Sequence, residues 1–139
     1  MYEYRIARLN KVIDGDTMDV EIDLGFDISL SKRIRLAGID TPESRTKDLH
    51  EKALGLEAKE WLKHRLENAE LIRIKTVKPD STEKYGRILG WLYLGDNSVS
   101  INEEMIQKGL AWSYLGDTKV KDFELLAQIR KSYQESKSA

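Results

Sequence analysis

Acidic side chains in the first third of the sequence have the types and spacing for metal-assisted hydrolysis. Asp16 and Asp40 supply hard oxygen ligands of the kind that Ca²⁺ prefers, and the backbone carbonyl of Thr41 could add a third. Glu43 follows Asp40 by three residues and could hold an attacking water. Asp14 opens the Asp-Gly-Asp turn that contains Asp16. Such a set would hold a cation next to a water nucleophile.

Two arginines would complete this chemistry. Arg35 and Arg87 carry planar guanidinium groups that can each bond two phosphate oxygens at once. Hydrolysis of a phosphodiester needs a cation that neutralises phosphate oxygens, a group that positions or deprotonates water, and donors that match the transition state. The carboxylates and the arginines meet these needs only if the fold brings them to one place.

Each of these features also has an ordinary structural interpretation. Asp14 and Asp16 could simply close a turn between two strands, because Asp and Gly are favoured there. Arg35 on the polar side of a strand is commonly a solvated or paired charge. Residues 40–43 read as a turn that ends a strand and leads towards a helix, and Gly86 could supply an unusual backbone angle. The spacing alone leaves these alternatives open.

The elements that must position these residues begin with strands. Apolar and polar residues alternate or concentrate in five segments, which predict β-strands at 4–12, 18–24, 30–36, 71–77 and 88–94. In the third strand, Leu30, Ile34 and Leu36 share one face and two arginines lie on the other. Pro42 cannot continue a ladder, so this strand must end before it.

Three helices are predicted. The first lies within residues 50–68, with an apolar stripe formed by Ala53, Leu56, Ala58, Trp61, Leu62 and Leu66. A short helix would begin at Asn102 as its N-cap and stop at Gly109. The last helix, at 119–135, would place on one face Phe123, Leu126, Ile129 or Arg130, and Tyr133.

Composition limits the class of protein. The chain has 139 residues, which suits one domain over 1–139, and its 40% hydrophobic and 34% charged residues are typical of a globular protein. The predicted elements favour an α+β fold built on a small closed or nearly closed barrel. The absence of cysteine excludes disulfide scaffolds and cysteine nucleophiles. His50 and His64 lie on a charged helix face, which favours a surface role over general-base catalysis.

Charge is unevenly distributed along the chain. The net charge is −1, but residues 1–29 hold 3 Lys or Arg against 7 Asp or Glu, and residues 30–90 hold 14 against 10. The balanced total argues against a protein that simply coats nucleic acid. An acidic opening followed by a basic middle would suit a cation site facing an anion-binding surface, whereas the alternative is two ordinary solvated faces.

Five motifs, taken together and in order, resemble those of the staphylococcal nuclease (thermonuclease) family over about residues 5–130. The motifs are Val12-Ile13-Asp14-Gly15-Asp16-Thr17, Ile34-Arg35-Leu36, Asp40-Thr41-Pro42-Glu43, Lys84-Tyr85-Gly86-Arg87 and Gly109-Leu110-Ala111. The resemblance implies a five-stranded OB-type β-barrel with three α-helices. It also implies a Ca²⁺-dependent nuclease that cleaves DNA and RNA at the 5′ P–O bond, leaves 3′-phosphate ends and has little sequence preference.

The same resemblance implies roles for the acidic residues. Asp16, Asp40 and the Thr41 carbonyl would bind one Ca²⁺. Asp14 would orient metal-bound water without binding the metal itself. Glu43 matches the residue that is usually assigned to water activation.

Roles in substrate binding are implied as well. Arg35 and Arg87 match the pair that clamps the scissile phosphate, and Lys84 and Tyr85 match positions that contact the neighbouring phosphate and nucleotide. The family's well-known secreted member has closely spaced tyrosines after the last motif. Here Tyr114 is the main aromatic candidate for the nucleotide pocket.

Two further points separate this chain from that member. Trp112 is a second candidate for stacking on a base. The segment between Asp16 and Arg35 is longer than in the secreted member, which leaves the geometry of the intervening hairpin open.

DNA and RNA are the expected partners, with single-stranded substrate preferred, and we expect a monomer with no membrane association. No signal peptide opens this chain, which favours a cytoplasmic protein, although a secreted protein would read the same once its leader was removed. The alternative function is a catalytically weak or inactive OB-fold module that binds nucleic acid or protein, as in Tudor-nuclease scaffold proteins. The enzyme is favoured because the chain retains Asp16, Arg35, Asp40, Glu43 and Arg87.

Overall fold

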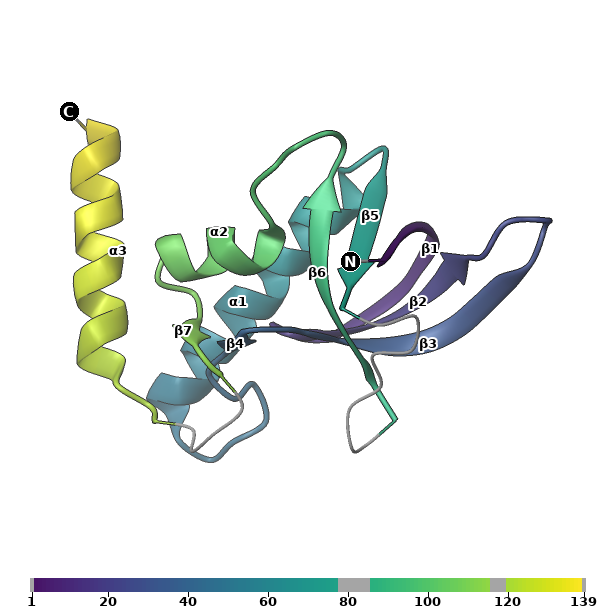
Figure 1. The fold of residues 1–139 in the computed structure, drawn as a ribbon. Helices are drawn as coiled ribbons and strands as arrows, with labels where there is room; N and C mark the ends of the chain where they lie inside the picture. Colours follow the sequence, from purple (N-terminus) through teal and green to yellow (C-terminus); the bar gives the residue numbers. More distant parts are fainter. Residues whose placement is uncertain (1, 78–85, 116–119, 139) are drawn as a thin grey trace.

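A closed five-stranded barrel forms the centre of the computed structural model, which describes residues 2–77, 86–115 and 120–138 (Figure 1). The strands follow the order β1-β2-β3-β6-β5 around the barrel. Their bounds are β1 Tyr2–Asp14, β2 Thr17–Asp23, β3 Ser29–Leu36, β5 Ile72–Thr76 and β6 Ile88–Leu94. These strands and the three helices confirm the predicted α+β fold class.

One parallel contact closes the barrel. The pairs β1–β2, β2–β3, β1–β5 and β5–β6 are antiparallel, whereas β3 and β6 run parallel. The parallel seam consists of the pairs Ile34↔Ile88, Arg35↔Leu89 and Leu36↔Gly90. Arg35 therefore sits on a strand whose neighbours are β2 on one side and the beginning of β6 on the other.

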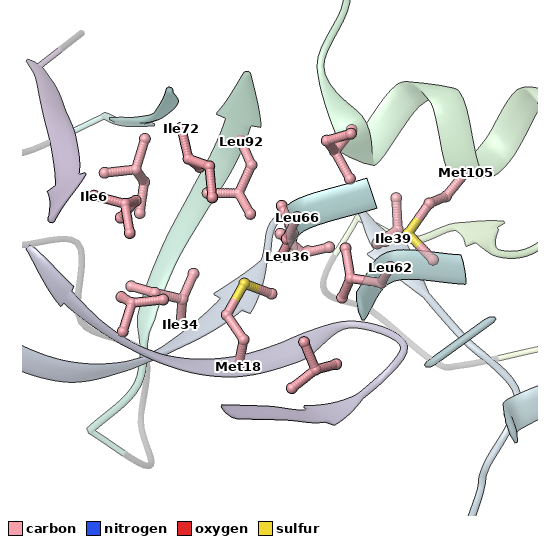
Figure 2. Close-up of a cluster of buried hydrophobic side chains, with 14 of the residues drawn as sticks. Ile6, Met18, Ile34, Leu36, Ile39, Leu62, Leu66, Ile72, Leu92 and Met105 are labelled. Carbon is pink, nitrogen blue, oxygen red and sulfur yellow. The ribbon is translucent and has the colours of Figure 1, made fainter. Parts of the chain in front are cut away.

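Alternating apolar residues fill the barrel. Met18, Val20 and Ile22 of β2 are buried, as the period of two predicts. They form one core cluster with residues of the other strands and of the helices, including Ile34, Leu36, Ile74, Leu92, Leu62, Leu66, Ile101 and Met105 (Figure 2). Each fully buried side chain of this size stabilises the fold by about 1.5–3 kcal/mol relative to its exposed state.

The three predicted helices are present, with shifted limits. They are α1 Leu49–Glu67, α2 Ile101–Gln107 and α3 Phe123–Ser138. Leu126 is buried in α3, and Phe123 and Tyr133 are half-buried, which confirms the predicted face of that helix. In Figure 1, α3 stands beside α2, on the side of the molecule opposite the β2–β3 hairpin. None of the described helices is long and apolar enough to cross a membrane.

The buried stripe of α1 differs from the predicted one. Ala58, Leu62 and Leu66 are buried as predicted, but Ala53 and Leu56 are exposed. The stripe instead continues through Gly55 and Glu51. The buried face of the N-terminal half differs from the predicted one because this half of α1 packs against the backbone of Glu43 and Ser44. Only a small residue, such as Gly55, or a hydrogen-bonding residue, such as Glu51, fits there.

The start of α2 also corrects a prediction. Ser100, rather than Asn102, is the N-cap, and its side chain accepts a hydrogen bond from the backbone N–H of Glu103 at 3.0 Å. Asn102 is buried, where its amide donates to the carbonyls of Ala37 and Gly90 and accepts from the N–H of Leu92. Buried backbone groups need partners, and this side chain supplies three of them.

Two features lie beyond what periodicity could predict. A two-stranded sheet pairs β4 (Ile39–Asp40) with β7 (Trp112–Ser113), and strands of two residues carry no readable pattern. The long β2–β3 hairpin projects away from the barrel (Figure 1). As a result Leu30 is exposed, although it faces the same way as the buried Ile34.

Candidate active site

Arg35 lies against two of the predicted metal ligands. Its Nη2 atom is 3.6 Å from Asp16 Oδ2 and 3.6 Å from Asp40 Oδ1. The three side chains are only 7%, 13% and 7% exposed, respectively. Arg35 Nη1 also donates to the carbonyl of Leu36 at 2.6 Å. The fold thus brings together residues from the β1–β2 turn, β3 and β4 that the sequence places apart.

Hydrogen bonds fix the Asp16 carboxylate. The hydroxyl of Thr17 donates to Oδ1 at 2.9 Å, and the hydroxyl and N–H of Thr41 donate to Oδ2 at 3.1 and 3.3 Å. Thr41 is itself buried. These bonds hold the β4 end beside the Asp14–Asp16 turn, so that Thr41 joins the two carboxylates at one site.

The donors present suit a hard cation. Asp16 and Asp40 offer carboxylate oxygens close to one another and largely screened from solvent. Over the described parts of the chain, no three His, Asp or Glu side chains gather closely enough to form a metal cage by themselves. A cation here would therefore bind two carboxylates and complete its shell with a backbone carbonyl and water, which is the oxygen chemistry of hard divalent cations such as Ca²⁺ and Mg²⁺.

Asp14 is tied to the loop that follows β4. Ser44 Oγ donates to Asp14 Oδ1 at 2.6 Å. Ser44 is buried and Asp14 is half-buried. The bond places Asp14 beside the 40–44 segment.

Glu43 projects from the same loop and is exposed. Its backbone is held by α1, because its N–H donates to Glu51 Oε2 at 2.9 Å. Gly55 is one turn further along α1, and a Cβ there would lie 2.6 Å from the carbonyl carbon and oxygen of Glu43 and from the nitrogen of Ser44. The helix backbone therefore packs directly against the peptide that joins these two loop residues.

The parallel pairing of β3 with β6 also determines the position of the second arginine, Arg87. Arg87 immediately precedes β6 and is half-buried. Because Ile88 pairs with Ile34 at the first position of the seam, Arg87 lies next to the end of the seam that contains Arg35. Lys84 and Tyr85 lie outside the described residues.

The aromatic candidates divide into one surface residue and one buried residue. Tyr114 is half-buried, and its N–H donates to the carbonyl of Gly38 at 2.8 Å, next to β4. Trp112 is only 5% exposed, donates from Nε1 to the carbonyl of Asp122 and packs edge-on against Phe123. Trp112 is thus part of the packing beneath α3, which corrects the suggestion that it stacks on a base.

Two residues near the site were missed by the sequence analysis. Lys121 Nζ lies 2.7 Å from Glu51 Oε2, the same oxygen that accepts the N–H of Glu43. Asp48 and Glu51 have the spacing of a capping box, and Asp48 does cap α1. In that pattern Glu51 would bond the N–H of Asp48, but in the structure the carboxylate reaches Glu43 instead. In the sequence, the spacing of Asp48 and Glu51 was the signal available for Glu51, and it predicts a bond within α1 rather than a contact with a distant loop.

The fold and the site define the class of protein to which this chain belongs. The profile described as "Staphylococcal nuclease homologue" matches residues 33–139, so the chain is a member of that family. The match includes Arg35, Asp40 and Glu43, and it begins after Asp16.

Individual relatives extend the similarity to the N-terminal strands. The chain is 31% identical over 134 residues to a thermonuclease of Staphylococcus hyicus, which covers 96% of this chain and 72% of that protein. It is 32% identical over 130 residues to the SPbeta prophage-derived endonuclease YokF of Bacillus subtilis, covering 94% of this chain and 40% of the relative. It is 28% identical to the uncharacterized protein MJ1439 of Methanocaldococcus jannaschii over 139 residues, 87% of this chain and 65% of that protein. The chain thus spans only part of each relative.

Proposed function

We propose that this protein is a Ca²⁺-dependent nuclease that hydrolyses phosphodiester bonds of DNA and RNA at the 5′ P–O bond and leaves 3′-phosphate ends. The observation that carries the proposal is the buried Arg35 guanidinium within 3.6 Å of both Asp16 and Asp40. A purely structural ion pair would need one carboxylate. Two buried carboxylates beside one guanidinium offer the oxygen ligands that a divalent cation needs.

In this proposal Asp16, Asp40 and the Thr41 carbonyl hold Ca²⁺, and the bound ion would neutralise charge on the phosphate oxygens. Asp14 supports this group from the side, through its contact with the 40–44 loop.

Other side chains activate the water, stabilise the developing charge and bind the substrate. Glu43, exposed at the edge of the site, holds the attacking water and takes up its proton. Arg35 and Arg87 bond the phosphate oxygens on which charge develops. Lys84, Tyr85 and Tyr114 bind the adjoining phosphate and nucleotide, and the nuclease names of the relatives in Staphylococcus hyicus and Bacillus subtilis support this substrate class.

The proposed substrate is single-stranded or locally opened nucleic acid, and the proposed unit is one domain over residues 1–139 acting as a monomer. An aromatic contact such as Tyr114 needs an unstacked base, which single strands offer at little cost. Cleavage assays on single- and double-stranded DNA and RNA, with Ca²⁺ or with chelator, test the activity. If none of the four substrates gives a Ca²⁺-dependent product, the protein is a binding module instead.

Replacement of the arginines tests the assigned clamp. Arg35→Ala and Arg87→Ala should each lower turnover by about 100-fold or more, the loss expected when a transition-state donor is removed. Arg33→Ala is the matched control, because Arg33 lies two residues before Arg35 on β3 but is exposed and paired with Asp19. Turnover is measured at saturating single-stranded DNA. Near-normal cleavage by either clamp variant would refute the assignment.

A further inference from the structure

The carboxylate of Glu51 connects two segments that are far apart in the sequence. Glu51 is 6% exposed, and its Oε2 accepts both the N–H of Glu43 at 2.9 Å and the Nζ of Lys121 at 2.7 Å. A buried carboxylate is costly unless it is paired and hydrogen-bonded. Lys121 supplies the charge and Glu43 supplies the second donor, so the three groups depend on one another.

Beside this contact, the backbone of the Glu43 loop packs directly against α1. Any Cβ at position 55 would meet backbone atoms of Glu43 and Ser44 at 2.6 Å, so α1 packs against this peptide without an intervening side chain. The Glu51 hydrogen bond and the Gly55 contact together hold the backbone of Glu43 on one side. The position of its side chain in the site follows from that backbone.

Lys121 belongs to the segment that leads into α3. The neighbouring Asp122 accepts a hydrogen bond from the buried Trp112, which fixes this segment against β7. The hydrogen bond to Glu51 raises the pKa of Lys121, and the carboxylates of Glu43 and Asp40 raise it further. The ammonium charge is therefore close enough to the site to interact with its carboxylates.

We infer that Glu51 and Lys121 form a positioning pair for Glu43, through which the segment before α3 controls turnover at the site. The inference rests on the proposed nuclease function, and neither residue touches the substrate. Without Lys121, the Glu51 carboxylate is buried next to no cation and no longer stays in place as the acceptor for Glu43. Displacement of a catalytic group by about 1 Å can cost on the order of 100-fold in rate.

Variants that remove the cation or the acceptor test the pair. Lys121→Met and Glu51→Ala should lower kcat on single-stranded DNA by about 10- to 100-fold and leave KM unchanged. Lys121→Arg keeps a cationic donor and should restore kcat. The Glu43 amide should exchange its hydrogen about 10-fold faster or more in both loss-of-contact variants, because a hydrogen bond to a charged group is lost.

Arg130→Met is the matched control. Arg130 also ties α3 to the rest of the molecule, by bonds to Glu57 and to the carbonyl of Gly109, but it does not touch the Glu43 loop. It should lower thermal stability without changing kcat or the exchange rate of the Glu43 amide. An equal fall in kcat in this control would overturn the inference, because general loosening of α3 would then explain the effect.

Two other outcomes are decisive. If the wild-type chain cleaves and Lys121→Met and Glu51→Ala are folded with unchanged kcat, the inference is wrong and the proposed function stands. If the wild-type chain cleaves no substrate, the proposed function fails, and the inferred control of turnover fails with it.

Discussion

Arg35 lies beside two buried carboxylates, those of Asp16 and Asp40. This arrangement determines the electrostatics of the site. Burial of a charge is unfavourable unless it is compensated, and the Arg35 guanidinium lies 3.6 Å from both carboxylates. On the proposed function, the site would hold a cation at these carboxylates before substrate arrives. It also has a reason to keep a guanidinium rather than an ammonium, because only the planar fork can serve both acidic neighbours and a phosphate.

Removal of one carboxylate should weaken the metal site. Asp40→Asn keeps the shape of the side chain but removes its charge, and Ca²⁺ affinity measured by calorimetric titration should fall by at least about 10-fold. Asp19→Asn is the control, since Asp19 lies on β2 near Asp16 but pairs with Arg33 outside the site. An affinity unchanged by Asp40→Asn would remove that residue from the ligand set.

Glu51 should make the stability of the fold depend on pH. Burial alone would raise the pKa of Glu51, but hydrogen bonds from Lys121 and from the N–H of Glu43 outweigh it and hold the pKa below its usual value. A depressed pKa stabilises the folded state above the unfolded-state pKa of about 4.3, and this contribution is lost as pH falls through the folded-state value.

The measurement is urea unfolding of the wild type and of Glu51→Gln at neutral pH and at about pH 3. The wild type should be the more stable at neutral pH, and the difference should shrink in acid as the carboxylate becomes protonated. A difference that grows on acidification would show that the pKa of Glu51 is raised in the folded state.

Much of the site could be predicted from residue types, and the remainder could not for a physical reason. Asp16 and Asp40 were expected to bind one cation and Arg35 to clamp a phosphate, and the structure brings these three side chains together. The role of Glu51 could not be predicted because its spacing from Asp48 suggests a bond within the helix. Its partners in the structure come from the Glu43 loop and from the segment before α3. A contact between distant segments leaves no periodic trace in either of them.

Among the elements, α1 supports the loop that contains Glu43. Its first turns carry Glu51 and Gly55 against the 43–44 peptide, and Ala58 lies where a Cβ at Gly15 would come within 2.8 Å of it. Small residues at these positions let the helix backbone approach both the 14–16 turn and the 40–44 loop. The same helix thus fixes the two segments that provide Asp16 and Asp40.

A methyl group at position 55 should push these segments apart. Gly55→Ala gains about 1 kcal/mol of helix propensity. The overlap with backbone atoms at 2.6 Å cannot be relieved by a flexible side chain, and overpacking costs about 1–3 kcal/mol. We therefore expect a lower melting temperature and reduced turnover.

Thermal unfolding by circular dichroism measures this effect. Lys52→Ala, at an exposed position of α1, is the control and should change stability by less than about 0.5 kcal/mol. A Gly55→Ala variant that is more stable and fully active would mean that the loop moves away from α1 without cost.

The elements themselves were predictable where their pattern was long. The strands and α1 extend over enough residues for their period to be read, and they were confirmed within a few residues. The start of α2 was misplaced because Ser100 and Asn102 are both good N-caps, and the choice depends on the hydrogen bonds that Asn102 makes with the backbone of Ala37, Gly90 and Leu92. The β4–β7 pair depends wholly on tertiary contacts.

At the scale of the whole molecule, the near-zero net charge limits how the protein meets nucleic acid. The chain carries 23 basic and 24 acidic residues, so attraction to a polyanion depends on the few cations at the site. If Arg35, Arg87 and Lys84 contact about three phosphates of a single strand, the slope of log affinity against log salt should be about −2.

Fluorescence anisotropy with labelled single-stranded DNA and the Glu43→Gln variant, which should bind without cleaving, measures this slope between about 50 and 200 mM salt. A slope steeper than about −6 would contradict the local clamp, because it would require many more released counterions than the site can account for.

The parallel seam between β3 and β6 has a consequence for how activity appears as the chain folds. Only three residue pairs join these strands, and they come from distant parts of the sequence, so closing the seam costs loop entropy that the β1–β2 and β2–β3 hairpins do not incur to the same extent. Arg35 lies in that seam and Arg87 at its entrance. A chain that has formed its hairpins but not closed its barrel would have both arginines and yet no clamp. During refolding, the rate at which cleavage activity returns should therefore report the rate of barrel closure rather than the rate of strand formation.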